Sequence, residues 1–86
     1  MPRATRPYRY ATVPLLGNAP DVTDAEWKPI KVAKPFSRKA IMHALKAAIG
    51  MTGHPGKTTI SGSRLTYRPE GHGSWAAIIE PVSERG

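Results

Sequence analysis

The segment around residues 36–50 constrains the fold most strongly, because a helix start, a helical repeat and a helix stop coincide there. Ser37 is a favourable N-cap residue, since its hydroxyl oxygen can accept a hydrogen bond from an amide of the first turn. Phe36 before it and Ile41 after it have the spacing of a hydrophobic staple. Gly50 stands where a residue with positive φ ends many helices. We therefore expect a helix over residues 38–49.

The predicted helix has an apolar face and a basic face. At about 100° per residue, its apolar side chains gather on one side. These residues are Ile41, Ala44, Leu45, Ala48 and Ile49. Lys39, His43 and Lys46 fall on the opposite side. An apolar helix face has to be covered by another layer, so the rest of the chain must supply an apolar surface.

The C-terminal part of the chain has the alternating pattern of β-strands that can supply this surface. Leu65 and Tyr67 share one face of a predicted strand. The strand over 74–80 is apolar on both faces, which favours a central position in a sheet. Gly62 begins a predicted two-residue turn, although a single bent strand over 57–68 with a bulge at Gly62 fits the same residues.

The expected fold class is α+β. We predict a small two-layer domain in which the helix over 38–49 packs on one face of a short antiparallel sheet. The sheet has a C-terminal meander at 57–80, and Trp27 is expected to close the rim of the core on the helix side.

The first half of the chain predicts shorter elements. Residues 10–16 have the composition of a first strand. Thr23 and Glu26 match the capping-box pattern, which predicts a single helical turn over 24–28. Residues 28–34 predict either a short strand at a sheet edge or an extended connector, because prolines bracket this segment.

The chain ends are predicted to lie outside the domain. Pro2 and Pro7 remove two amide donors, and little near them is apolar, so residues 1–9 indicate a flexible basic arm. Such an arm either contacts phosphates or remains a solvated tail. The expected organisation is this arm, a single small α+β domain over 10–82 and a tail over 83–86.

Charge carries the functional prediction. The chain of 86 residues holds 13 lysines and arginines against 6 acidic residues, a formal net charge of +7. Between Trp27 and Pro69 there are nine basic residues and no acidic one. A basic segment without interspersed acids departs from the mixed-sign surface that solubility alone favours. It is typical of proteins that bind polyanions or acidic surfaces. A solvated basic face without a partner explains the same pattern equally well.

No catalytic, metal or cofactor site is predicted. The absence of cysteine excludes thiolate metal sites, and the three histidines are too far apart for a zinc motif. The Gly56-Lys57-Thr58 run is not a phosphate loop, because Met51 occupies the position of the motif's first glycine. We predict no enzymatic activity and no small-molecule substrate. A small basic nuclease stays open, because His and Lys alone can serve acid–base roles.

The first functional hypothesis is a small basic non-enzymatic protein that binds DNA, RNA or a ribonucleoprotein through a Lys/Arg patch. The alternative is a protein-binding module, such as a small phage or mobile-element inhibitor or assembly subunit, that docks on an acidic protein surface or adds a strand at residues 29–34. The same residues are the candidate contacts in both. They are Arg3, Arg6, Arg9, Lys39, His43, Lys46, Lys57, Arg64 and Arg68.

The sequence also bears on location. No run approaches the ~20 apolar residues of a membrane-spanning helix. The N-terminus has no apolar stretch of the length that a secretory signal needs. We therefore expect a cytoplasmic or virion-associated protein that does not bind membranes. The oligomeric state is not predicted.

Overall fold

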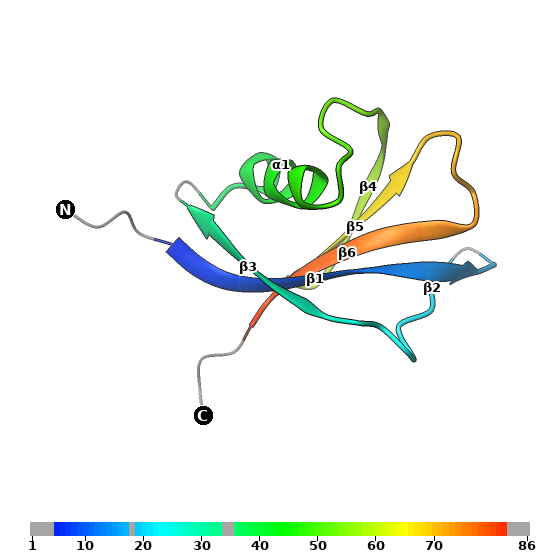
Figure 1. Cartoon of the computed structure of the whole chain (residues 1–86), viewed down its shortest axis with the longest axis horizontal. Helices are drawn as coiled ribbons and strands as arrows, with labels where there is room; N and C mark the ends of the chain where they lie inside the picture. Colours follow the sequence, from blue (N-terminus) through cyan, green and yellow to red (C-terminus); the bar gives the residue numbers. More distant parts are fainter. Residues whose placement is uncertain (1–4, 18, 34–35, 83–86) are drawn as a thin grey trace.

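One helix packs on a curled, half-barrel-like antiparallel sheet in the computed structural model, which describes residues 5–17, 19–33 and 36–82 (Figure 1). The sheet order is β2-β1-β6-β5-β4, and β3 pairs with β1. The strands are β1 (Thr5–Leu16), β2 (Ala19–Pro20), β3 (Lys28–Ala33), β4 (Gly56–Ser61), β5 (Arg64–Pro69) and β6 (Trp75–Pro81), and the helix is α1 (Arg38–Ala48). The expected α+β class is confirmed.

The helix α1 forms as its local signals predict. The Ser37 hydroxyl oxygen accepts a hydrogen bond from the amide of Ala40 at 3.2 Å, and Gly50 has a φ of +75°. Ile41 and Leu45 are buried against the sheet. The helix lies on the concave side of the curled sheet, and we call this side the helix face (Figure 1). Its buried core residues are Tyr8, Val32, Ile41, Leu45, Leu65, Tyr67, Ala77 and Ile79.

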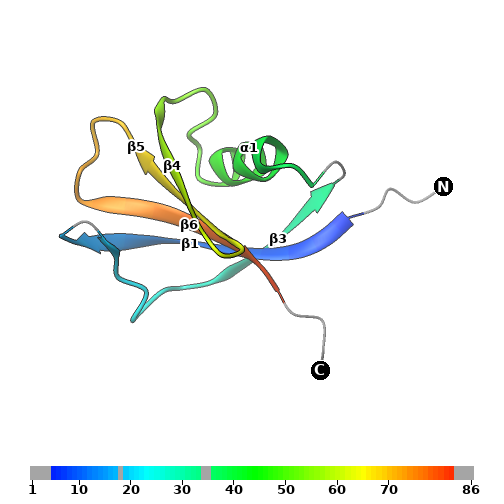
Figure 2. The same ribbon diagram turned by 180° about the vertical axis from the view of Figure 1, so that it is seen from behind.

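The opposite side of the sheet, which we call the open face, carries a second, smaller core. It is formed by Ala11, Val13 and Ile78, with Trp27 among the side chains that cover them. Figure 2 shows the segment before β3 on this side, away from α1. The expectation that Trp27 closes the rim of the helix-side core is therefore wrong. Both faces of β6 are buried, as predicted for a central strand.

The predicted helical turn over 24–28 does not form. An Asp21 carboxylate oxygen accepts hydrogen bonds from the amide and the hydroxyl of Thr23, at 3.1 and 2.6 Å. In a capping box the Thr23 amide would donate to the Glu26 carboxylate, but here it donates to Asp21 in an Asx-type turn. The next turn closes through the amide of Ala25 on the carbonyl of Val22. The capping-box prediction fails because a competing local hydrogen bond is made instead.

The flexible arm is also wrong for residues 5–9, which belong to β1. Residues 5–10 pair with β3 and residues 8–14 pair with β6, so the segment has neighbours on both sides. Pro7 lacks an amide hydrogen, but its carbonyl accepts a hydrogen bond from Val82. Tyr8 is buried in the helix-side core. Residues 1–4, including Arg3, and the predicted tail at 83–86 lie outside the described residues.

The strand pairing decides the remaining predictions, which concern residues 28–34 and 57–68. β3 pairs with β1 on one edge within the described sheet, as expected for an edge strand. β4 and β5 form a hairpin in which Ser61 pairs with Arg64 across a two-residue turn, and Gly62 has a φ of +63°. The alternative of one bent strand over 57–68 is therefore wrong. No helix in the described part of the chain has the length and apolar character needed to span a membrane.

Candidate functional site

The predicted contact residues divide between the two sides of the sheet. Lys39, His43 and Lys46 lie on α1, above the helix face. Four other predicted contact residues lie on strands and point to the open face, because their positions alternate with helix-face residues. They are Arg9, Lys57, Arg64 and Arg68. Arg6 lies over the Phe36 ring at 4.3 Å, near the start of α1. The structure thus gives two basic groups with the sheet between them, rather than one patch.

The basic side chains of α1 form the first group. We define the α1 ridge as Arg38, Lys39, His43 and Lys46. The first three are exposed, whereas Lys46 is half-buried. The ammonium of Lys46 lies 5.1 Å from the centre of the Tyr67 ring, a cation–π distance that holds it near the sheet.

Two open grooves flank the α1 ridge. One, of about 700 Å³, separates the ridge from β4 and the loop before it, and its far wall includes Thr52 and Thr58. The other lies between α1 and β3, and its lining includes Lys31. Lys39 and His43 line both grooves. No described acidic residue lines either one, so both grooves present positive charge without a compensating carboxylate.

Arg9 and Arg64 on the open face both form ion pairs with Glu80. A carboxylate oxygen of Glu80 lies 2.6 Å from Arg9 and the other lies 2.8 Å from Arg64. Within the described residues, Glu80 is the only carboxylate at ion-pair distance from a Lys or Arg side chain. The Arg9 guanidinium also lies 4.1 Å from the Trp27 ring centre, and that of Arg64 lies 6.0 Å from it. These two arginines hold the Trp27 ring against the sheet by cation–π contacts.

The pKa of Glu80 reflects this network. Partial burial of the carboxyl raises its pKa, but the hydrogen bonds and positive charges of Arg9 and Arg64 outweigh that effect. The pKa of Glu80 consequently lies below its ordinary value of 4.5. Glu80 is therefore ionised at neutral pH, and the two arginines are engaged with it instead of being free for a ligand.

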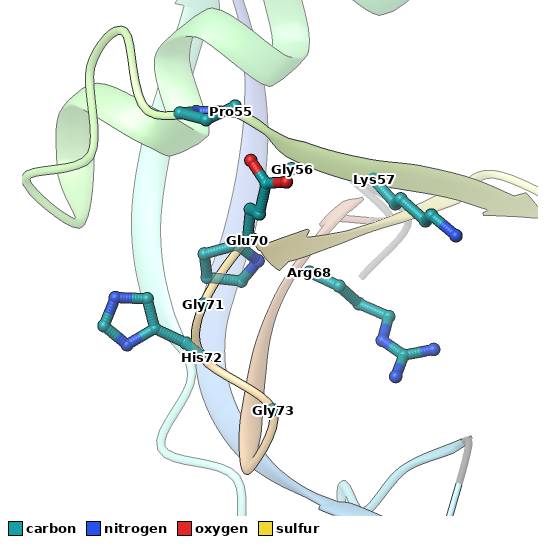
Figure 3. Close-up of a pocket in the computed structure, with 9 residues that line it drawn as sticks. Pro55, Gly56, Lys57, Arg68, Glu70, Gly71, His72 and Gly73 are labelled. Atoms are coloured by element: carbon teal, nitrogen blue, oxygen red, sulfur yellow. The ribbon is translucent and has the colours of Figure 1, made fainter.

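Lys57 and Arg68 form the second free group, at the end of the β4–β5 hairpin. They are direct partners in the antiparallel register, so their side chains leave the same face. An open depression of about 580 Å³ lies beside them and extends to the loop at residues 70–73. Figure 3 shows both side chains extending to one side of the hairpin, whereas His72 extends to the other.

The loop histidines have structural surroundings. The Nε2 of His54 donates to the carbonyl oxygen of Glu70 at 2.9 Å, and the His54 ring lies 5.6 Å from that of His72. The His72 ring lies 5.7 Å from that of Trp75. The described residues include no group of three or more His, Cys, Asp or Glu side chains arranged to hold a metal ion.

Sequence reasoning missed Lys31 and Arg38 as lining residues of the two grooves. Both belong to the acid-free segment, so the charge pattern contained a signal for them. It included Arg9 and Arg64, although Glu80 engages both. Glu80 lies 71 positions from Arg9 and 16 from Arg64, separations at which local patterns give no signal.

Comparisons with known proteins do not assign this chain to a family. A scan against protein-family models, a search of curated proteins and a search of solved structures each found no match to this chain.

Proposed function

We propose that this protein is a non-enzymatic nucleic-acid-binding protein that contacts the phosphate backbone through the α1 ridge. The observation that carries the proposal is that both grooves beside α1 are lined by cationic residues and by no described acidic residue. Lysine and arginine side chains release the counterions condensed on a nucleic acid, and this release drives binding. Phosphate contacts position a protein without reading sequence, so we propose binding with little sequence preference.

The helix geometry supports the choice of the ridge. Lys39, His43 and Lys46 recur at intervals of four and three residues, so they form a row along the helix axis. The rise of about 1.5 Å per residue separates the two lysines by roughly 10 Å. The grooves on either side leave the ridge prominent, which gives an extended polyanion access to it.

The test is a titration of fluorescently labelled single-stranded and duplex DNA and RNA, followed by anisotropy at 25 to 200 mM salt. If four phosphates are neutralised, the log–log salt slope is about −3.5. Lys39→Glu should weaken binding at least about fivefold at the lowest salt. The matched control is Lys28→Glu, because Lys28 is equally exposed but lies beside Asp24 and Glu26. Absence of binding at 25 mM salt, or equal losses in both variants, would refute the proposal.

A second candidate function is docking on an acidic protein surface, and one observation favours it. β4 is an edge strand in the described sheet, every residue of it is exposed, and Ile60 keeps 47% of its surface in contact with solvent. An unpaired edge can accept a strand from a partner. Poly-glutamate provides the comparison: if it binds more tightly than an oligonucleotide of equal charge, the protein-docking function is favoured over nucleic-acid binding.

A further inference from the structure

The Lys57–Arg68 pair is a feature that folding alone does not explain. The two residues are direct cross-strand partners on the open face. Like charges in such positions repel and destabilise a hairpin. The hairpin nevertheless carries both of them, next to an open depression. A negatively charged ligand between the two side chains would turn this repulsion into attraction.

On the same face, another basic pair is engaged by a carboxylate of the protein itself. Arg9 and Arg64 share Glu80, with ion-pair distances of 2.6 and 2.8 Å. Lys57 and Arg68 have no such partner among the described residues. Glu70 also lines the depression, but Figure 3 shows its carboxylate near the Gly56 label and well separated from both cationic groups.

The backbone beneath the pair is tightly packed. A Cβ atom on Gly56 would lie 2.5 Å from the carbonyl oxygen of Arg68 and 2.6 Å from the ring of Tyr67. The Tyr67 hydroxyl in turn donates to the carbonyls of His54 and Pro55, at 2.8 and 3.2 Å. This packing fixes the strand register that places Lys57 opposite Arg68. The cationic pair is thus held on a rigid base.

We infer that Lys57 and Arg68 bind a phosphate monoester group, such as the terminal phosphate of a nucleic acid. Two cations at one point match a monoester, whose charge near pH 7 is about −1.5 to −2. A backbone phosphodiester carries one negative charge and leaves the pair incompletely neutralised. The guanidinium can bind two phosphate oxygens at once, and the ammonium acts as a point charge on a third. The assignment to a chain end rests on the proposed nucleic-acid function, whereas the phosphate site itself does not.

The site is first tested with inorganic phosphate alone. Amide chemical shifts of the ¹⁵N-labelled protein are followed during titration with sodium phosphate, against sodium chloride at equal ionic strength. The expected result is saturable, phosphate-specific shifts centred on residues 56–58 and 67–73, lost in Lys57→Gln/Arg68→Gln and retained in Lys39→Gln/Lys46→Gln. Absence of specific shifts up to 20 mM phosphate, or their persistence in the Lys57→Gln/Arg68→Gln variant, would overturn the site.

The source of the phosphate is tested with oligonucleotides of one sequence that carry a 5′-phosphate, a 3′-phosphate or only hydroxyl ends. The wild-type protein should bind one of the phosphorylated forms at least fivefold more tightly than the hydroxyl form. Lys57→Gln/Arg68→Gln should abolish this preference, whereas Lys39→Glu should weaken all three forms by one common factor. Equal binding of the three forms by the wild type would refute recognition of chain ends. Phosphate-specific shifts without oligonucleotide binding would refute the nucleic-acid function but keep the site.

Glu70→Gln is a control variant in which phosphate binding should become tighter instead of weaker. Removing the carboxylate that lines the depression should tighten phosphate binding about twofold, because the positive potential at the pair increases. Weaker binding by this variant would contradict the placement of the phosphate beside Lys57 and Arg68.

Discussion

Glu80 is the residue whose replacement should most clearly affect stability through charge. Glu80→Gln removes the negative charge that Arg9 and Arg64 share. The arginine side chains are 42% and 34% exposed, so water compensates part of the loss. We expect urea unfolding at pH 7 to show a loss of about 1–2 kcal/mol. The matched control is Glu26→Gln, an exposed position where the change should stay within about 0.5 kcal/mol.

The pH dependence of the same variant follows from the lowered pKa of Glu80. A carboxyl with a lower pKa in the folded than in the unfolded state stabilises the fold above its unfolded value, near 4.5. This stabilisation disappears as the pH falls through the lower folded value. The wild type and Glu80→Gln should therefore differ at pH 6 and converge at about pH 2. A difference in unfolding free energy that persists undiminished at pH 2 would contradict a charge-based role.

Gly56 is predicted to be the least replaceable glycine of the hairpin. In Gly56→Ala the new Cβ would meet the Arg68 carbonyl oxygen and the Tyr67 ring, which are backbone and core atoms that cannot move freely. We expect a loss of about 1–3 kcal/mol in urea unfolding. Gly73→Ala is the control, because nothing lies within 4 Å of its Cβ. Similar losses for the two variants would show that the close approach at Gly56 does not govern the effect.

At the scale of elements, α1 begins at a cap that can be tested directly. Ser37→Ala removes the acceptor for the Ala40 amide and should cost about 1 kcal/mol in chemical unfolding. Ser37→Asp keeps an acceptor and adds a negative charge near the helix N-terminus, where the first turn holds no acidic residue. We therefore expect Ser37→Asp to be at least as stable as the wild type. A loss equal to that of Ser37→Ala would show that the missing acceptor is not the cause of the loss in Ser37→Ala.

The elements that the sequence predicts well are those whose signals are local. The helix has a cap, an apolar stripe and a glycine stop, and the β4–β5 turn has Gly62 at a position with positive φ. The start of β1 was missed because its support comes from β3 and β6. A local signal did exist there: Tyr8 alternates with Arg9, and the two side chains lie on opposite faces of the sheet.

The candidate site was less predictable than the fold. The charge pattern identified basic residues but not which of them Glu80 would engage, since that depends on long-range pairing. It also suggested a single patch, although strand alternation places Lys57 and Arg68 on the face opposite α1. The periodicity of apolar residues indicates which side chains are buried, whereas the ion pairs of individual charges follow only from the assembled sheet.

At the scale of the whole molecule, unpaired positive charge should outweigh the Glu80 ion pairs in setting the response to salt. The net charge of +7 destabilises the compact state through self-repulsion, which ions screen. Salt also screens the contacts of Glu80, but these are few and partly buried. We expect the thermal unfolding midpoint to rise by about 4–8 °C between 10 and 500 mM sodium chloride, as a change near 1 kcal/mol would give.

Neutralising one cation on each face isolates the cause of this response. Lys39→Gln/Lys57→Gln lowers the net charge by two units, and both side chains are exposed, so the core is untouched. This variant should unfold at a higher temperature than the wild type at 10 mM salt and should respond less to added salt. Differential scanning calorimetry measures both quantities. A midpoint that falls with salt in the wild type would instead show that the Glu80 ion pairs dominate. In that case repulsion among the unpaired cations would not destabilise the fold, and a polyanionic ligand would not stabilise it by reducing this repulsion.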